Sequence, residues 1–141
     1  MGNCANLCRR NREEIGGPQK VKVENVRFYR SGSDGRPGEM LDQNKRFWTT
    51  DQRIHARVKL SHVVMGMSGK VVWVCVDSGG LAPRNYEIVS CALESLVMNL
   101  IETHAELPRP WPVGLYSLEV FIDNEKIHTE PFEIVEKPVT T

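Results

Sequence analysis

This chain of 141 residues has few cysteines, no net charge and no long apolar run. Four cysteines are too few for the framework of a disulfide-rich secreted protein, so we expect a reducing compartment. Eighteen basic and eighteen acidic residues cancel, which leaves no global field to draw the protein onto nucleic acid or an anionic membrane. No apolar run approaches the roughly 20 residues that cross a bilayer, and no signal-peptide core is evident. We therefore expect a cytoplasmic protein with a soluble body.

Catalytic and cofactor motifs are also missing. The sequence has no Gly-x-Ser-x-Gly elbow, phosphate loop or dinucleotide fingerprint. Cys75 lies in an apolar stretch, where a thiol is usually an inert filler. Cys4 and Cys8 lack a second ligand pair at zinc spacing, and the four histidines are scattered singly. We expect no enzyme, no metal and no cofactor; catalysis would need His62 or His104 beside a thiol or hydroxyl in a cleft.

Alternating apolar and polar residues, by contrast, are abundant and predict β-strands. In residues 53–61 every second side chain is apolar, as in a strand with one buried and one wet face. Residues 71–76 are apolar on both faces, which predicts a strand covered on both sides. Residues 116–134 form two alternating runs around an Asp-Asn pair, which has the chemistry of a hairpin turn. A one-residue slip at Asn25 predicts a bulge in a first strand.

Residues 86–104 fit two interpretations. Val89 and Leu93 fit one face of a helix, but Ile88 and Val97 interrupt its polar side. Two short strands would instead keep the regular strand spacing of a sandwich. We favour the two strands.

The last hairpin begins with Trp-Pro-x-Gly-x-Tyr and ends with Phe-x-Ile. The positions that carry this pattern are Pro112, Gly114, Tyr116, Asp123, Asn124, Phe132 and Ile134. Together with the short strands and glycine turns, the pattern resembles the small immunoglobulin-like accessory modules. The resemblance implies an all-β, Ig-like antiparallel β-sandwich of about seven strands, with at most one short helix. It would span residues 19–136, between tails at 1–18 and 137–141, and it implies that the domain binds other proteins.

The first residues carry a lipidation pattern. Removal of the initiator methionine would expose Gly2 for myristate, and Cys4 and Cys8 could take palmitate, which gives the two anchors that stable attachment needs. Asn6 departs from the motif, which has Ser or Thr there, so a plain polar tail is the competing interpretation. The anchored protein would be peripheral on the cytosolic face of a membrane, with residues 1–12 as the contact.

Basic residues occupy the wet face of the strand at 53–61: Arg53, His55, Arg57 and Lys59. They form a candidate surface for an acidic partner or phospholipid heads, and the alternative is the solvated side of an antiparallel sheet. Aromatic residues are not interleaved with these cations, so we expect no nucleic-acid partner.

Some aromatic residues lie outside the alternating apolar faces and are candidate contacts for a partner: Phe47, Trp48, Trp111 and Phe121. Aromatic side chains at a rim are typical interface anchors. The alternative is that each folds over a sheet edge as part of the core.

We therefore predict a non-enzymatic protein-interaction module or accessory subunit. It would bind another protein or a membrane-complex subunit by edge-strand or face docking. The alternative is a small-ligand or lipid-binding sandwich with a cavity lined by Val58, Leu60, Trp73 and Tyr116. A densely filled core would favour the interaction module.

Overall fold

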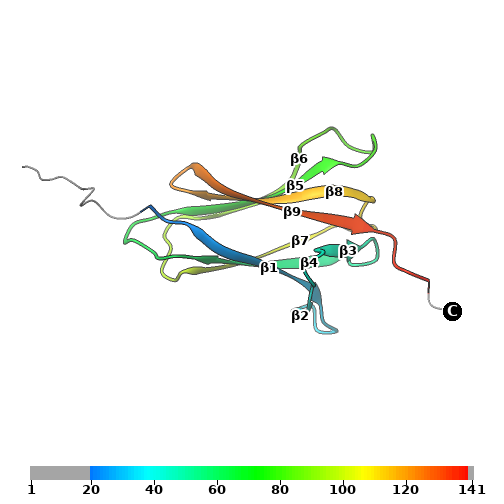
Figure 1. The fold of residues 1–141 in the computed structure, drawn as a ribbon, viewed down its shortest axis with the longest axis horizontal. Helices are drawn as coiled ribbons and strands as arrows, with labels where there is room; N and C mark the ends of the chain where they lie inside the picture. Colours follow the sequence, from blue (N-terminus) through cyan, green and yellow to red (C-terminus); the bar gives the residue numbers. More distant parts are fainter. Residues whose placement is uncertain (1–19, 140–141) are drawn as a thin grey trace, which may run out of the picture.

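The computed structural model describes residues 20–139. Its strands are β1 (Val23–Ser31), β2 (Pro37–Met40), β3 (Arg46–Trp48), β4 (Arg53–Leu60), β5 (Gly69–Asp77), β6 (Tyr86–Leu93), β7 (Leu100–Glu106), β8 (Gly114–Ile122) and β9 (Glu125–Val135). They form a four-stranded sheet, β2-β1-β4-β7, and a five-stranded sheet, β3-β9-β8-β5-β6. Figure 1 shows the sheets as two facing layers, with the first and last described residues at opposite ends. Within residues 20–139, no helix is long and apolar enough to cross a membrane.

This arrangement confirms the predicted all-β sandwich. The strands outnumber the expected seven or so because β2 and β3 contain only four and three residues, too few for an alternating pattern to reveal them. The sheets are antiparallel except where β3 runs parallel to β9. The pairing of β1 with β4 changes register between Val23 and Asn25, as the slip in the sequence predicts.

The ambiguous segment forms two strands, as we favoured. β6 and β7 belong to different sheets, so residues 94–99 carry the chain from one layer to the other. Leu96 in this crossover is buried, and its side chain lies against Gly69, where an added Cβ would come within 3.1 Å of a Leu96 methyl carbon. Leu96 is therefore the one residue of this crossover that belongs to the core.

The interior is filled by aromatic side chains from both sheets. The ring centroid of Phe132 lies 4.9 Å from that of Phe28, 5.5 Å from Tyr116, 5.6 Å from Phe47 and 5.8 Å from Trp73. Each of these side chains is at most 3 % exposed. Edge-to-face and stacked contacts of this kind add to the burial of apolar area. The aromatic cluster therefore holds the two layers together.

Trp73 also joins the sheets by a hydrogen bond. Its indole Nε1 in β5 donates to Oγ1 of Thr103 in β7 at 3.1 Å, and both residues are buried. Since the indole has no other polar group and water does not reach it, Thr103 is the group that satisfies it. This bond fixes how β5 and β7 lie across the interior.

The Pro-x-Gly-x-Tyr pattern has a direct structural role at the start of β8. The Tyr116 hydroxyl donates to the carbonyl of Pro112 at 2.7 Å, the geometry of a tyrosine corner. Burial, and then the neighbouring Cys75, raises the pKa of Tyr116, so the phenol keeps its proton. Position 114 requires glycine because the carbonyl oxygen of Asp77 would lie 2.3 Å from any added Cβ.

The predicted hairpin turn joins β8 to β9. Asp123 and Asn124 have φ values of 49° and 68°, the left-handed pair that suits the twist of a two-residue hairpin. The Asp123 carboxylate also accepts the backbone N–H of Ser68 at 2.9 Å, which ties the turn to the residue before β5.

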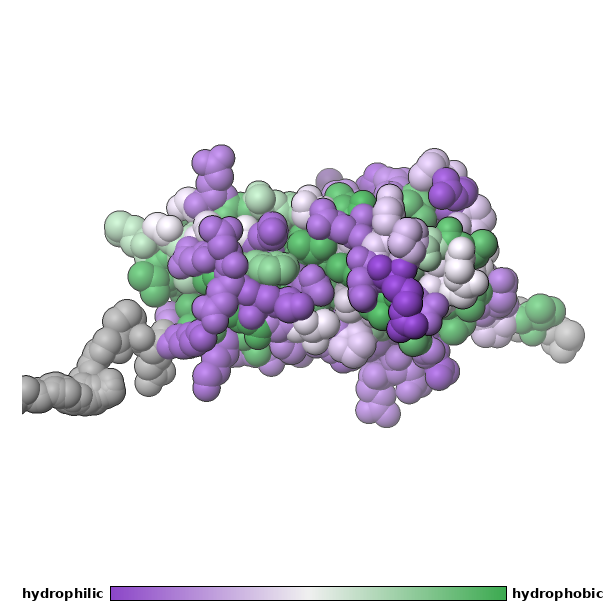
Figure 2. Space-filling model, turned by 90° about the horizontal axis from the view of Figure 1, so that it is seen from above, coloured by the Kyte–Doolittle hydropathy of each residue, from purple (hydrophilic) through white to green (hydrophobic). Residues whose placement is uncertain are grey.

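One prediction about β5 is wrong. Val72 and Val74 are buried on its outer face, as expected, but no further layer covers them in residues 20–139. Their cross-strand neighbours are Glu119 and Ser117 on β8, with β6 on the other side. Figure 2 looks onto this face and shows hydrophilic side chains standing over hydrophobic ones. The flanking strands therefore shield the two valines.

Thr103→Val keeps the shape of the side chain but removes the acceptor of the Trp73 N–H. A buried donor without a partner costs about 1–3 kcal/mol, so we expect that loss in the free energy of unfolding, measured by chemical denaturation. Thr129→Val changes an exposed threonine of β9 and is the control, with an expected change below about 0.5 kcal/mol. Equal losses in the two variants would contradict the bridging role of Thr103.

Candidate interaction surface

The β6 strand forms an open edge of the five-stranded sheet. Among residues 20–139 its single strand partner is β5, so its outward backbone groups face away from the sheet. Most of its side chains are exposed, including Tyr86 and Val89. Glu87 is the only charged residue in the strand. An unpaired strand of this kind is a template for another strand.

The other sheet edges differ from β6 in length or charge. β2 and β3 are very short, and β2 begins with a proline. β7 places Glu102, His104 and Glu106 on exposed positions along its length. Short edges, prolines and charges are the usual means of blocking strand addition. β6 is a long edge with no proline and with Glu87 as its one charge.

Exposed apolar side chains extend from β6 along the chain into β7. Val97 and Met98 in the crossover are exposed, as is Leu100 at the start of β7. Together with Tyr86 and Val89 they form what we call the β6 rim. These side chains follow the chain from the first residue of β6 to the start of β7.

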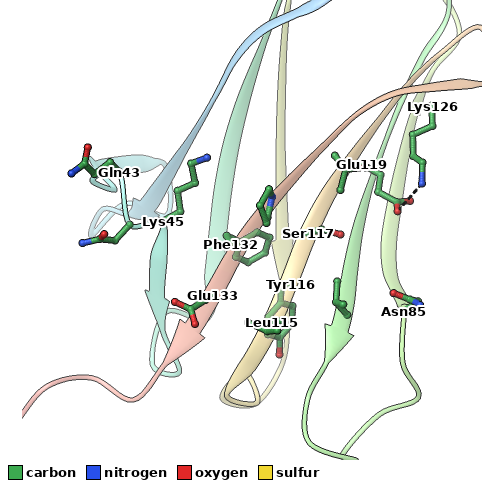
Figure 3. A pocket seen from close by; sticks show the side chains of 14 residues that line it. Gln43, Lys45, Asn85, Leu115, Tyr116, Ser117, Glu119, Lys126, Phe132 and Glu133 are labelled. Carbon is green, nitrogen blue, oxygen red and sulfur yellow. Dashed lines mark hydrogen bonds and ion pairs between the residues drawn. The ribbon is translucent and has the colours of Figure 1, made fainter.

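A second candidate surface is an open depression of about 570 Å³ on the outer face of the five-stranded sheet. Figure 3 shows Leu115 and Ser117 of β8 within it, and Glu119 paired with Lys126 at 3.4 Å along one side. Because the charged groups around this depression are already paired, it offers few polar groups to orient a small ligand.

Two of the four predicted aromatic contacts are core residues, so their prediction as surface anchors is wrong. Phe47 is fully buried because β3 pairs with β9 and turns the ring toward Phe132. Trp111 is 1 % exposed, its Nε1 donates to the carbonyl of Gln52 at 2.9 Å, and its ring packs on Tyr116.

The other two predicted contacts lie at the surface beside cations. Trp48 is half-buried beneath the Arg30 guanidinium, 3.8 Å from its ring centroid. Phe121 is half-buried on the outer face of β8, with the Lys70 ammonium 4.6 Å from its ring centroid. Both rings are thus partly covered by cation–π contacts.

The predicted basic stripe is neutralised by carboxylates of neighbouring strands. The ion pairs are Arg53–Glu106 at 3.0 Å, Arg57–Glu102 at 2.7 Å and Lys59–Glu24 at 3.7 Å. These pairs face solvent on the outer side of the four-stranded sheet. The stripe is therefore a mixed-charge sheet face and not a cationic surface.

His55 departs most from the predicted wet face, because it is only 6 % exposed. The end of β1 and the loop that follows it fold over His55, with Ser31 Oγ 2.7 Å from His55 Nε2 and the Gly35 carbonyl accepting from Arg53 Nη1 at 3.2 Å. His104 lies across from it, with ring centroids 5.9 Å apart. The sequence gives no sign of this cluster, since it depends on how the loop folds.

Ser31 of β1 and His55 of β4 form a side-chain contact between the two strands, which we call the latch. The Ser31 hydroxyl donates its one proton to the carbonyl of Arg53 at 3.0 Å. With the Ser31 proton directed at the Arg53 carbonyl, Ser31 Oγ accepts from His55 Nε2, and the pair holds the end of β1 against β4. Burial, and then the charges of His104 and Arg53, lowers the pKa of His55, which favours the neutral ring.

His62 also lies beside a hydroxyl group that bonds to the backbone. His62 Nδ1 lies 3.0 Å from the hydroxyl of its sequence neighbour Ser61, which also accepts the backbone N–H of Lys22. Within residues 20–139, no group of three or more His, Cys, Asp or Glu side chains is placed to hold a metal ion.

The residues predicted to line a ligand cavity belong to the packed core. Val58, Leu60 and Trp73 are fully buried within the cluster. Tyr116 is buried with its hydroxyl bonded to Pro112. Gly2, Cys4 and Cys8, the predicted lipidation sites, lie outside the described residues.

No protein-family model and no curated protein matches this chain. An immunoglobulin-like protein from Pseudomonas aeruginosa superposes with a TM-score of 0.55 at 13 % identity, over 84 % of this chain and 99 % of the other. This chain has an immunoglobulin-like β-sandwich fold. A β-glucosidase from Listeria innocua is also similar, with a TM-score of 0.48 at 12 % identity, over 85 % of this chain and 16 % of the other. Likeness at this level concerns the fold, and a shared sandwich does not transmit function.

The latch predicts a pH dependence of stability. The pKa of His55 in the folded protein is below its ordinary value of 6.5, so the unfolded chain binds more protons as the pH falls below about 6.5, and stability is lost there. His55→Gln should reduce the fall in unfolding free energy between about pH 7 and pH 5, measured by denaturation at each pH. Thr129→Val, which changes no titratable group, is the control and should keep the wild-type dependence of unfolding free energy on pH. If the unfolding free energy of His55→Gln fell with pH as steeply as that of the wild type, this histidine would not be the cause of the lost stability.

Proposed function

We propose that this protein is a non-enzymatic interaction module, or accessory subunit, that binds another protein by strand addition at β6. The observation that carries the proposal is the open β6 edge, which is long, nearly uncharged and bordered by the β6 rim. In strand addition, backbone hydrogen bonds give affinity and alternate side-chain pockets give specificity. Outward backbone groups are available along β6, and the side chain of Val89 is exposed beside them.

The rest of the molecule supports this role by acting as a scaffold. The interior is filled, the charges on the outer face of the four-stranded sheet are paired, and His55 is engaged in a latch. Binding by an edge strand needs only a rigid sheet behind it, which the β5–β8–β9 ladder supplies.

The proposed module is held at the cytosolic face of a membrane by acyl groups on Gly2, Cys4 and Cys8. Support comes from the residues themselves, because one myristate holds a membrane weakly and a second acyl chain makes attachment stable. The arginines that follow these positions would contact anionic lipid headgroups. A tethered interaction module would recruit its partner to the membrane surface.

Val89→Lys tests the proposed edge. A lysine on an exposed edge position opposes strand addition, so we expect capture of the partner from a lysate of the source cells to fall about tenfold or more relative to the wild type. Leu81→Lys places the same charge on an exposed loop and should leave capture unchanged. Equal capture by Val89→Lys and the wild type, with both proteins folded, would show that β6 is not the binding edge.

Intact-mass spectrometry of the protein from its own cells tests the tether. We expect the mass of a myristoyl group plus palmitoyl groups, with the palmitoyl part released by hydroxylamine. Gly2→Ala removes the myristate acceptor and should move the protein from the membrane fraction to the supernatant. An unmodified wild-type mass would contradict the tether while leaving the β6 edge untouched.

A further inference from the structure

Two loops at one end of the sandwich carry exposed apolar side chains. Residues 61–68 lead from β4 into β5, and residues 94–99 lead from β6 into β7. The backbone N–H of Leu96 donates to the carbonyl of Met67 at 2.8 Å, which joins the two loops. Figure 1 shows both loops at the end of the molecule opposite the C-terminus.

Each loop places one apolar side chain in the core and another in water. Met67 and Leu96 belong to the core, so they anchor their loops to the sandwich. Met65 is 98 % exposed and Val97 is 87 % exposed, so neither side chain adds to the core. Figure 2 shows hydrophobic side chains at this end of the molecule. We call the exposed set the apolar tip, which consists of Val64, Met65, Val97 and Met98.

The first described residue lies at the same end of the sandwich as the apolar tip. The Lys20 ammonium pairs with the Glu125 carboxylate at 3.0 Å, and Glu125 is the first residue of β9. The turn before Glu125 is bonded to the β4–β5 loop, because the Asp123 N–H donates to the Ser68 carbonyl at 3.1 Å. Residues 1–19 therefore join the sandwich at the end that carries the tip.

We propose that the apolar tip inserts into the headgroup and upper acyl region of a phospholipid bilayer. The inference rests on the membrane tether of the proposed function and names the surface that faces the lipid. Acyl groups on Gly2, Cys4 and Cys8 would hold the chain at the bilayer through the end that carries the tip. A second contact made by the same chain is intramolecular, which raises its effective concentration. The tether therefore favours insertion of the tip.

The apolar tip has what a lipid surface requires and little that a protein partner would recognise. Its first turn is closed by a hydrogen bond from the Met67 N–H to the Val64 carbonyl at 3.0 Å, and Leu96 satisfies the Met67 carbonyl. Satisfied backbone groups lower the cost of entering an apolar medium. Valine and methionine add apolar area for insertion, but they provide no hydrogen bond and no aromatic anchor of the kind that dominates protein interfaces.

The charges beside the apolar tip are largely paired. The ion pairs are Lys20–Glu125 at 3.0 Å and Lys59–Glu24 at 3.7 Å. Glu94 is the only carboxylate within the two loops. We therefore expect apolar contact, and not net charge, to hold the tip in the bilayer.

Insertion of the apolar tip leaves the β6 edge accessible. β6 runs from Tyr86, at the far end of the sandwich, to Leu93 beside the tip, so the strand extends away from the bilayer. Val97 and Met98 of the β6 rim would contact lipid, whereas Val89 would remain open to an added strand. One molecule can thus hold the membrane and a partner strand at the same time.

Full-length protein attached chemically to vesicles tests the apolar tip apart from the tether. Coupling Cys4 to a maleimide lipid, with Cys8→Ser and Cys91→Ser, places the chain at the bilayer whether or not the cell acylates it. Cys75 is buried and stays unchanged. The vesicles are phosphatidylcholine with brominated acyl chains, which quench tryptophan emission on contact, and unbrominated vesicles are the reference.

Tryptophan reporters at the two ends of the sandwich give the comparison. Met65→Trp adds a reporter at the tip, and Leu81→Trp adds one on an exposed loop at the opposite end. We expect brominated chains to remove most of the emission that Met65→Trp adds and to leave the emission that Leu81→Trp adds. Val97→Glu placed beside Met65→Trp should abolish most of this quenching, because a carboxylate opposes entry into the acyl region.

The outcomes separate the apolar tip from the tether. Full emission from Met65→Trp, or equal quenching of the two reporters, would overturn insertion of the tip. If Met65→Trp is not quenched but Met65→Glu lowers capture of the partner from a lysate, the tip binds protein and the inference is wrong. Quenching of Met65→Trp together with an unmodified mass of the native protein would support the tip and contradict the tether.

Discussion

The hydrogen bond from the Trp73 indole to Thr103 is the contact on which the arrangement of the two sheets depends. It crosses the interior from β5 to β7 and satisfies a polar group that is shut off from water. Around it, Phe28 and Phe132 pack from opposite sheets, with ring centroids 4.9 Å apart. The side chains of this cluster fill the interior between the two sheets.

The outer faces of the two sheets and the β6 edge differ in the groups that they expose. On the four-stranded sheet, cations and carboxylates of adjacent strands neutralise one another. On the five-stranded sheet, the outer face is partly shielded by its own side chains. The β6 edge differs because its outward backbone groups face solvent and have no strand partner among residues 20–139. A strand added at this edge would pair with them, and exposed side chains of β6 would add apolar area to the same contact.

Much of the fold could be predicted from local sequence patterns. Alternation identified β4, and the Asp123–Asn124 turn chemistry identified the last hairpin, because side-chain period and turn residues act within a few positions. The motif at the start of β8 was also informative, because the Tyr116 hydroxyl bonds to Pro112 within the same short stretch. The reason for Gly114 is not local, since the Asp77 carbonyl that approaches it is distant in the chain.

The errors concern contacts between residues far apart in the chain. Phe47 lies in a three-residue strand whose burial depends on parallel pairing with β9. Trp111 follows prolines, where no period shows which way the ring points. The basic residues of β4 looked unpaired because Glu102 and Glu106 are about fifty positions away, and His55 is buried by a loop. The β6 strand was predicted, but its place at a sheet edge depends on strand order, which local patterns do not determine.

The most direct test of this account is amide hydrogen exchange of the folded protein, resolved by residue, at high dilution. We predict slow exchange throughout β5 and β8, and fast exchange at those alternate amides of Val89–Leu93 that point away from β5. Uniform protection along β6 at high dilution would contradict the open edge, and with it the central claim that this sandwich binds by strand addition.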